Sequence, residues 1–198
     1  STSPGAAWGL RCLVHDVSGV SVSDSDASSG VPVFPADSVD DGQNTNWCFS
    51  DTRTAWVGSA DPSFGLPANW SGGQVPTADT EVYIGDGGTI LIEAAPVVIR
   101  SLAIADGATV TVRTNLAVTG AVILEAGGTL VWDVPGGIGT DLVVLDGGTL
   151  THSPNATTEA CKIALEVAGG GYIAAGGTID ATGKGYAKAK GITVGAAS

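Results

Sequence analysis

A run of alternating aliphatic and polar residues, broken by a glycine turn, recurs every 20 residues in the middle of the chain. The first copy, Ile84–Ile90, reads IGDGGTI, and the next three copies begin at Ile104, Leu124 and Val144. A fixed period of this kind is typical of repeat proteins whose successive copies stack on one another. The repeat therefore predicts a single architecture for residues 81–183.

Alignment of the four copies also places aliphatic residues in columns outside the glycine turn. Neighbouring columns lie two residues apart, which is the period of a strand with one face inward. Short strands that return to the same place after each repeat form a β-solenoid, or parallel β-helix, with rungs about 4.8 Å apart. The fold class is therefore predicted to be all-β, with four core columns: Val82, Leu102, Val122 and Leu142; Ile84, Ile104, Leu124 and Val144; Ile90, Val110, Leu130 and Leu150; Val98, Val118 and Ile138.

A fifth copy, Ile173–Ile179, follows the fourth after a longer interval than the others, which indicates an insertion. The polar run at 152–159 predicts a loop that projects from the solenoid and offers the most individual contact surface of the repeat region. In this loop, Asn155 begins an Asn-Ala-Thr glycosylation pattern and is a candidate contact for a glycan or a partner. His152 is a second contact candidate, but its column is inward and predicts a partly buried structural histidine; the column also holds Ile92, Val112 and Trp132.

The flanks of the repeat predict three further segments. Residues 1–50 contain short β-like pieces between Ser/Asp/Gly-rich turns and predict a small N-terminal β segment, which could cap the solenoid. Residues 51–80 predict an aromatic cap on the first rung, formed by Trp56, Phe64 and Trp70. As an alternative, Trp56 and Trp70 form a platform on which sugar rings stack. Residues 184–198 form a Gly/Lys-rich tail.

Two stretches resemble segments of large bacterial surface proteins. The run SDSDASSG followed by DDGQNTNWCF resembles the closing turn of parallel β-helix repeats. The stretch from Trp56-Val57-Gly58 through NWSGGQVP to the first rung resembles the start of autotransporter-like passenger repeats. Together the two resemblances cover about residues 20–190 and imply an extracellular or cell-surface β-solenoid without implying an activity.

Composition and charge narrow the classes of partner. Thirty glycines and nine prolines among 43% hydrophobic residues agree with strands separated by frequent turns. A formal net charge of −12 disfavours nucleic acid and anionic membrane surfaces as partners. No run approaches the roughly 18 to 20 apolar residues of a membrane span, which predicts no direct membrane insertion. The absence of methionine predicts a processed product or a piece of a longer protein.

The three cysteines predict no metal or redox site. Their spacing contains no CxxC or CxxCH motif, which disfavours zinc and haem. Cys12 and Cys48 both lie in the N-terminal segment and could form a disulfide in an extracellular protein, or could be two small buried side chains. Cys161 lies far from both in sequence.

Candidate chemistry is sparse. Asp86, Asp106 and Asp146 share a column and could hold calcium, although a carboxylate before glycine also suits an ordinary turn. We expect no other cofactor. The two histidines and scattered carboxylates match no hydrolase, metalloprotease or nucleotide-binding motif, and Arg100 and Arg113 lie in different columns. The sequence therefore predicts no catalytic residues.

These observations predict a non-enzymatic extracellular structural protein that forms a β-solenoid element of a surface stalk, filament, sheath or adhesin. Its predicted partners are further copies of itself or neighbouring domains of the same surface protein, and glycans are a further possibility. A carbohydrate-binding module of a secreted protein is the alternative. A polysaccharide-active β-helix enzyme is a third hypothesis.

Overall fold

The computed structural model describes residues 6–11, 17, 19–29, 33, 35, 38–45, 47, 49, 53–58, 61–125 and 127–187. The chain divides into two compact units, residues 1–53 and 54–198. Both are built from β-strands, and the one helical element among the described residues is the short 3-10 helix η1, Pro67–Asn69. The all-β fold class predicted from the repeat is confirmed, and each unit is described below by itself.

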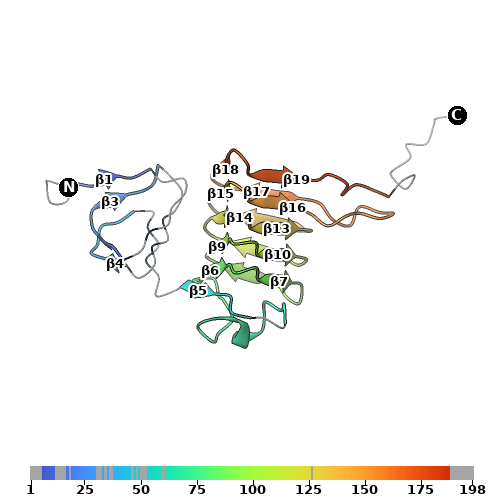
Figure 1. Ribbon diagram of the computed structural model, residues 1–198, viewed down its shortest axis with the longest axis horizontal. Helices are drawn as coiled ribbons and strands as arrows, with labels where there is room; N and C mark the ends of the chain where they lie inside the picture. The colour runs from blue at the N-terminus through green and yellow to red at the C-terminus, as the bar shows by residue number, and fades with distance from the viewer. Residues whose placement is uncertain are drawn as a thin grey trace. The chain divides into compact units, whose positions relative to one another are not determined.

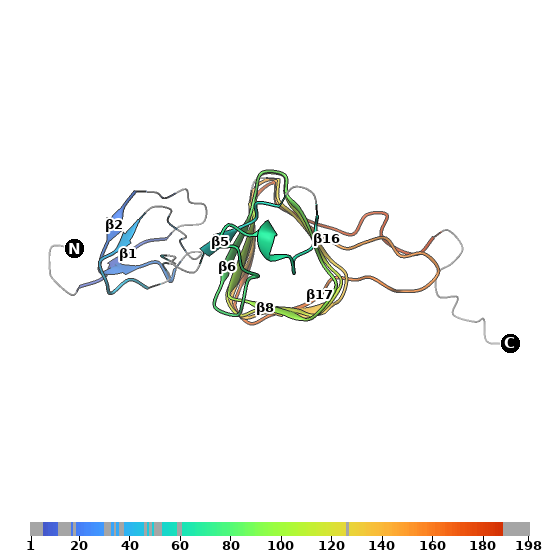
Figure 2. The same cartoon turned by 90° about the horizontal axis from the view of Figure 1, so that it is seen from below.

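The second unit is a parallel β-helix with three faces, roughly triangular when seen along the stack (Figure 2). One face carries β5 (Arg53–Ala55), β6 (Glu81–Ile84), β9 (Ser101–Ile104), β12 (Val122–Leu124), β15 (Leu142–Val144) and β18 (Gly171–Ile173). The next carries β7 (Thr89–Ile92), β10 (Thr109–Val112), β13 (Thr129–Trp132), β16 (Thr149–Thr151) and β19 (Thr178–Asp180). The third carries β8 (Val97–Ile99), β11 (Leu116–Val118), β14 (Pro135–Ile138) and β17 (Ala164–Val167). Successive rungs climb from β6 to β19 (Figure 1).

The strand register confirms the repeat seen in the sequence. Thr89 pairs with Thr109, which pairs with Thr129, and both pairings are parallel. The glycine turn between the first two faces is closed by a hydrogen bond from the Gly88 N–H to the Gly85 carbonyl, 3.0 Å. Gly87 at its tip has φ of 68°, a left-handed conformation that costs glycine little. The turn therefore explains why glycine recurs at this position.

The predicted fourth column is wrong in the first rung. Val118 pairs with Ile99, not with Val98, and Ile99 is buried whereas Val98 is 44% exposed. The corner between β7 and β8 is one residue longer than the corner between β10 and β11. This extra residue moves the strand by one position, so that Ile99 takes the inward position instead of Val98. The next corner is correspondingly shorter, so Leu102 and Val122 are again in register. The repeat length therefore stays constant although the third-face strand of the first rung is displaced by one residue.

At the corner between the second and third faces, two inward side chains of each rung share one volume of the core. In the second rung, Val112 and Leu116 face inward at this corner, and both are fully buried. In the third rung the corresponding residues are Trp132, which is fully buried, and Gly136. A Cβ built on Gly136 would lie 2.9 Å from the Trp132 Nε1, closer than real Cβ atoms approach other heavy atoms. Trp132 therefore occupies the space that a larger side chain at Gly136 would need.

The first unit also contains parallel pairs. Strand β1 (Trp8–Gly9) pairs with β3 (Ser25–Asp26), and β2 (Ser21–Val22) pairs with β4 (Val39–Asp40). The partners in each pair come from successive turns of the chain, and a further parallel bridge joins Asp26 to Thr45. The described residues of this unit are therefore arranged in stacked parallel turns. The role of residues 1–50 as a cap on the solenoid stays a prediction.

Candidate functional site

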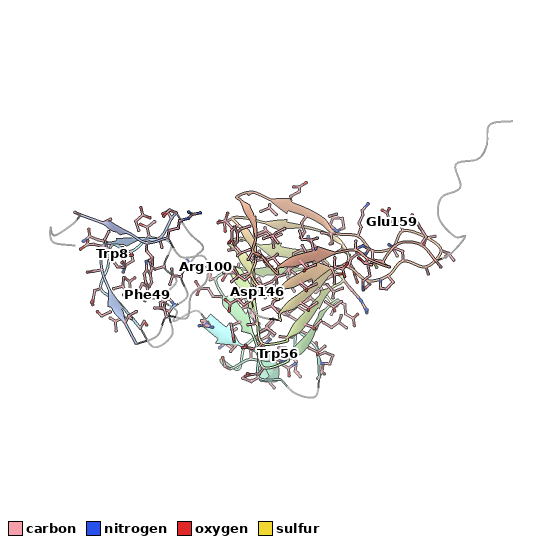
Figure 3. All side chains as sticks on the ribbon, turned by 45° about the horizontal axis from the view of Figure 1, so that its top comes forward. Trp8, Phe49, Trp56, Arg100, Asp146 and Glu159 are labelled. Atoms are coloured by element: carbon pink, nitrogen blue, oxygen red, sulfur yellow. The ribbon has the colours of Figure 1, made fainter. Side chains whose placement is uncertain are left out.

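The aromatic residues before the first rung form a buried cluster. Trp56 and Trp70 pack edge to face with ring centroids 5.1 Å apart, and Phe64 packs against Trp70 at 4.9 Å. The Trp70 Nε1 donates a hydrogen bond to the Phe64 carbonyl at 2.9 Å. Asn69 holds the preceding loop, because its Nδ2 donates to the carbonyls of Asp61 and Ser63, each at 2.9 Å. This cluster covers the first rung, and Figure 3 shows Trp56 at that end of the stack.

Burial of these aromatic rings bears on the sugar-platform alternative. Trp56 is 9% exposed and Trp70 is 2% exposed. A sugar stacks on an aromatic ring only where one face of the ring is open, and neither indole offers such a face. Asn69, which begins the Asn-Trp-Ser glycosylation pattern, is 5% exposed and engaged in the two hydrogen bonds above. The cluster is therefore built as a plug rather than as a receptor.

A groove lies beside the plug, between it and the edge of β8. It has a volume of about 370 Å³ and is lined mostly by apolar residues, among them Phe64, Val75, Pro96 and Val98. Asp61 and Glu93 are the two acidic residues of its lining. No sequence pattern marked this groove, because it depends on the cap leaving the third face uncovered.

A row of polar residues follows the second face at the corner where the loop begins. Arg113 lies between Glu93 and Asp133, with its Nη1 3.6 Å from Glu93 Oε2 and its Nε 3.8 Å from Asp133 Oδ2. Asp133 is 5% exposed and accepts hydrogen bonds from the Ser153 N–H at 2.6 Å and hydroxyl at 2.8 Å. The residues of this row recur with the period of the repeat, so the row could have been found from the sequence. Its role is structural, because it fastens the start of the loop to the rung below.

His152 is buried at this corner, as its column predicted. It is 8% exposed, and its Nδ1 lies 2.8 Å from the Ser153 carbonyl. Such a contact fixes the ring orientation and suits a structural histidine.

The predicted loop is confirmed as a projection, and it is one of two stacked layers. Residues 153–163 leave the body of the solenoid, and residues 181–187 run alongside them (Figure 2). The Asn155 N–H donates to the Lys184 carbonyl at 2.9 Å, a contact that continues the register between β16 and β19. We call these two layers the arm. The sequence did not reveal the second layer, because its residues share no pattern with the first.

Asn155 is the main tie within the arm. Its Oδ1 accepts hydrogen bonds from the N–H groups of Ala160 and Cys161 at 2.7 and 2.8 Å. Its Nδ2 donates to the carbonyls of Cys161 and Lys184 at 2.8 and 3.2 Å. The side chain that a glycan would modify is thus fully engaged. Asn155 shapes the arm. The exposed Glu159, which lies in the arm (Figure 3), forms an ion pair with Lys162 at 2.7 Å.

Cys161 is a free thiol at the base of the arm. Burial raises the pKa of this thiol, and the nearby Asp133 carboxylate raises it further by charge repulsion and by accepting a hydrogen bond from the protonated form. A reactive cysteine needs the opposite shift, because the thiolate is the nucleophile. Cys12 and Cys48, the predicted disulfide pair, lie outside the described residues.

The aspartates of the calcium hypothesis lie on exposed turns. Asp86 and Asp106 have φ of 53° and 50°, so both occupy left-handed turn positions. Asp106 accepts a hydrogen bond from the Tyr83 hydroxyl at 3.0 Å. Within the described part of the chain, no three His, Cys, Asp or Glu side chains gather closely enough to hold a metal ion. Calcium binding by Asp86, Asp106 and Asp146 stays a prediction, and their geometry also fits turns without an ion.

The last rung differs from every other described rung in its exposure. Ile173 is 50% exposed and Ile179 is 48% exposed, whereas the residues below them in the same columns, Val144 and Leu150, are buried. The structure thus adds a feature that sequence reasoning missed, an apolar face on β17, β18 and β19 that no described strand covers. A repeat shows that rungs stack, but it does not show which rung is left open.

The chain matches no known family model, no curated protein and no solved structure. The stacked parallel sheets agree with the β-solenoid implied by the resemblance to bacterial surface proteins, whereas the autotransporter-like identity stays an expectation. No helix among the described residues is long and apolar enough to cross a membrane.

Proposed function

We propose that this chain is a non-enzymatic structural module of an extracellular bacterial assembly, a β-solenoid element of a surface stalk, filament, sheath or adhesin. The observation that carries the proposal is the continuity of the core. Three aliphatic columns run from the first rung to the last without a buried charge among them, and three sheets stay in register along the stack. A body of this kind holds its ends at a fixed separation, which is what a spacer requires.

The polar side chains support the same proposal, because they hold parts of the fold in place. Asn69 ties the aromatic plug, Asn155 ties the arm, and Asp133 anchors the start of the arm. Arg100 and Arg113 pair with separate carboxylates on different corners, Arg100 with Glu81 at 3.7 Å. Convergent titratable groups are the usual sign of an active site, and these groups are dispersed and structurally engaged.

Localisation on intact source cells tests the proposal. Antibody raised against the purified chain is expected to label the cell surface or extracellular material in immunoelectron microscopy, and the chain is expected to release no product from acidic or neutral polysaccharides. Label confined to the cell interior contradicts the extracellular role. Release of sugar product by the chain, lost in a heat-unfolded control, contradicts the non-enzymatic role.

The carbohydrate-binding alternative has a separate test. Retention of the chain on immobilised polysaccharides that is lost on Trp56→Ala or Trp70→Ala, with the fold kept, supports a binding module. We expect no retention, because both indoles are buried in the plug. Loss of structure in these variants is itself expected from the burial of the rings, so the folded fraction of each variant is measured first by circular dichroism.

A further inference from the structure

The groove beside the aromatic plug has the size and the lining of a ligand site. Its volume is about 370 Å³, which lies within the range of roughly 300–1,000 Å³ that is typical of ligand pockets. Its walls are mostly apolar, with Phe64, Val75 and Pro96 among them, and its polar groups are few. Every residue of the lining belongs to the solenoid unit. The groove is therefore a feature of this unit by itself.

The groove exists because the cap covers two faces of the first rung and leaves the third open. The loop before η1 runs parallel to β7, since Ser63 bridges Leu91 and the Leu91 N–H bonds to the Pro62 carbonyl at 2.7 Å. Strand β5 covers β6 in a similar way. Strand β8 has no neighbouring strand at this end among the described strands. Its edge therefore forms one wall of the groove.

The backbone of β8 opens into the groove at Val98. The Val97 N–H bonds to the Asn115 carbonyl at 2.9 Å, so Val97 directs its backbone groups to the rung above. Successive residues of a strand alternate, which directs the N–H and the carbonyl of Val98 to the opposite side, where the groove lies. At the next position of this kind, the Arg100 N–H is already bonded to the Thr80 carbonyl at 3.0 Å. An extended segment in the groove can therefore add to the sheet through Val98.

The charged side chains of the groove are acidic. Asp61 and Glu93 belong to its lining, and the described residues that line it include no lysine or arginine. Asp61 is exposed and accepts a hydrogen bond from the Ser63 N–H at 2.8 Å, and an ionised carboxylate accepts several such bonds. Glu93 lies 3.6 Å from Arg113, but both side chains are about half exposed, and an exposed pair of this kind is weak. The groove therefore favours a ligand that carries a positive charge.

We propose that the groove binds an extended peptide segment of another protein, in which aliphatic side chains flank a lysine or an arginine. The segment adds to β8 as a short strand, and its backbone bonds to the N–H and the carbonyl of Val98. Its aliphatic side chains displace water from the apolar walls, and its cationic side chain pairs with Asp61 or Glu93. This inference goes beyond the proposed structural role and does not depend on it.

A peptide matches this combination of groups better than a sugar or a lipid does. Sugar rings stack on open aromatic faces, whereas Phe64 is 3% exposed, and the groove has few polar groups to bond sugar hydroxyls. A lipid chain matches the apolar walls, but it makes no hydrogen bonds to the backbone of Val98. A peptide strand with one cationic side chain engages the walls, the backbone and the carboxylates together.

Fluorescence anisotropy of a labelled hexapeptide, titrated with the full chain, tests the proposal. The probe is Val-Thr-Val-Lys-Val-Thr with blocked ends, and it is expected to bind. The same peptide with glutamate in place of lysine is expected to bind at least about 10-fold more weakly, because it meets two carboxylates. A probe methylated at every peptide nitrogen is expected to weaken binding by about 10-fold, because it cannot donate to the Val98 carbonyl.

A glycine in the groove provides a variant that blocks the site without disturbing the core. Gly65 belongs to the lining, and a Cβ built on it meets no heavy atom closer than the Ser63 Oγ at 3.9 Å. Gly65→Leu is therefore expected to fold, to fill part of the groove and to raise the probe Kd at least about 10-fold. Gly72→Leu is the matched control in the same cap, since its Cβ lies 3.7 Å from the Thr54 Oγ1 and outside the groove, and it is expected to leave the Kd unchanged. Circular dichroism checks the fold of both variants.

Neutral variants of the two carboxylates test the charge recognition. Asp61→Asn and Glu93→Gln are each expected to raise the Kd of the lysine probe by about 2- to 5-fold, the range of an exposed ion pair, and to leave the glutamate probe no weaker. Glu166→Gln removes an equal charge from an exposed site outside the groove and is expected to change neither Kd.

Three results overturn the proposal. The first is the absence of probe binding at millimolar concentrations of the chain. The second is binding that Gly65→Leu leaves unchanged, or that the lysine and glutamate probes share equally. The third is self-association of the chain that Gly65→Leu abolishes, which would show that a second copy fills the groove. Each result leaves the structural role standing, because surface labelling and product release test that role separately.

Discussion

The corner shared by Trp132 and Gly136 gives the sharpest test of how this core is specified. If the two residues exchange volume, then giving the third rung the pair of the second rung, Trp132→Val with Gly136→Leu, restores a packing that the same chain already uses at Val112 and Leu116. Each single substitution is expected to be destabilising, and the double substitution much less so than their sum.

The magnitudes follow from the geometry. Trp132→Val empties part of a fully buried site and costs about 2–3 kcal/mol, less than a typical large-to-small change because the Trp132 Nε1 has no hydrogen-bond partner and its removal relieves a buried donor. Gly136→Leu places a Cβ 2.9 Å from that nitrogen and costs about 2–3 kcal/mol through overpacking. The sum is about 5 kcal/mol, and the double variant is expected to cost about 2 kcal/mol, so the coupling energy is about 3 kcal/mol.

Urea unfolding followed by circular dichroism measures each step of this cycle. Gly137→Leu is the matched control, because the nearest heavy atom to a Cβ at Gly137 is 4.0 Å away, and its combination with Trp132→Val is expected to be additive. Additive behaviour of the Trp132 and Gly136 pair, within about 0.5 kcal/mol, would refute the volume exchange.

Three further predictions address the columns, the arm and the thiol. Ile104→Asp puts an unpaired charge in a fully buried column and is expected to unfold the solenoid, whereas Thr109→Ser is expected to shift the melting temperature little; a stable Ile104→Asp chain would show that the column is misassigned. Asn155→Ala removes four hydrogen bonds and is expected to raise amide exchange in residues 153–163 while leaving the rungs protected, and uniform exchange would count against a separate arm. Because the pKa of Cys161 is raised, its alkylation by iodoacetamide is expected to need a higher pH than that of a free cysteine, and a rate profile that turns over at or below the ordinary thiol pKa would contradict the burial of this group.

The sequence by itself determined the repeat and therefore the class of fold. A fixed period, with aliphatic positions alternating along it and glycine at the turn, has one physical solution, because each rung buries its inward side chains only against its neighbours. Burial of His152 and a loop that projects after it also followed, although the loop spans residues 153–163 and not the predicted 152–159, since both depend on position relative to the period. These features are local or strictly periodic, and a linear pattern records them.

Only the tertiary structure decided where the period slips and which surfaces stay open. Val98 and Ile99 are adjacent in the sequence and both are aliphatic, so the sequence could not show which of them faces inward. The lengths of the two adjoining corners determine that Ile99 does. Trp132 was readable as a core residue, but its exchange of volume with Gly136 requires knowing that the two share a corner. The half exposure of Ile173 and Ile179, in the last rung that the structure describes, is likewise invisible in the repeat, because equivalent residues are buried or exposed according to whether another rung lies above them.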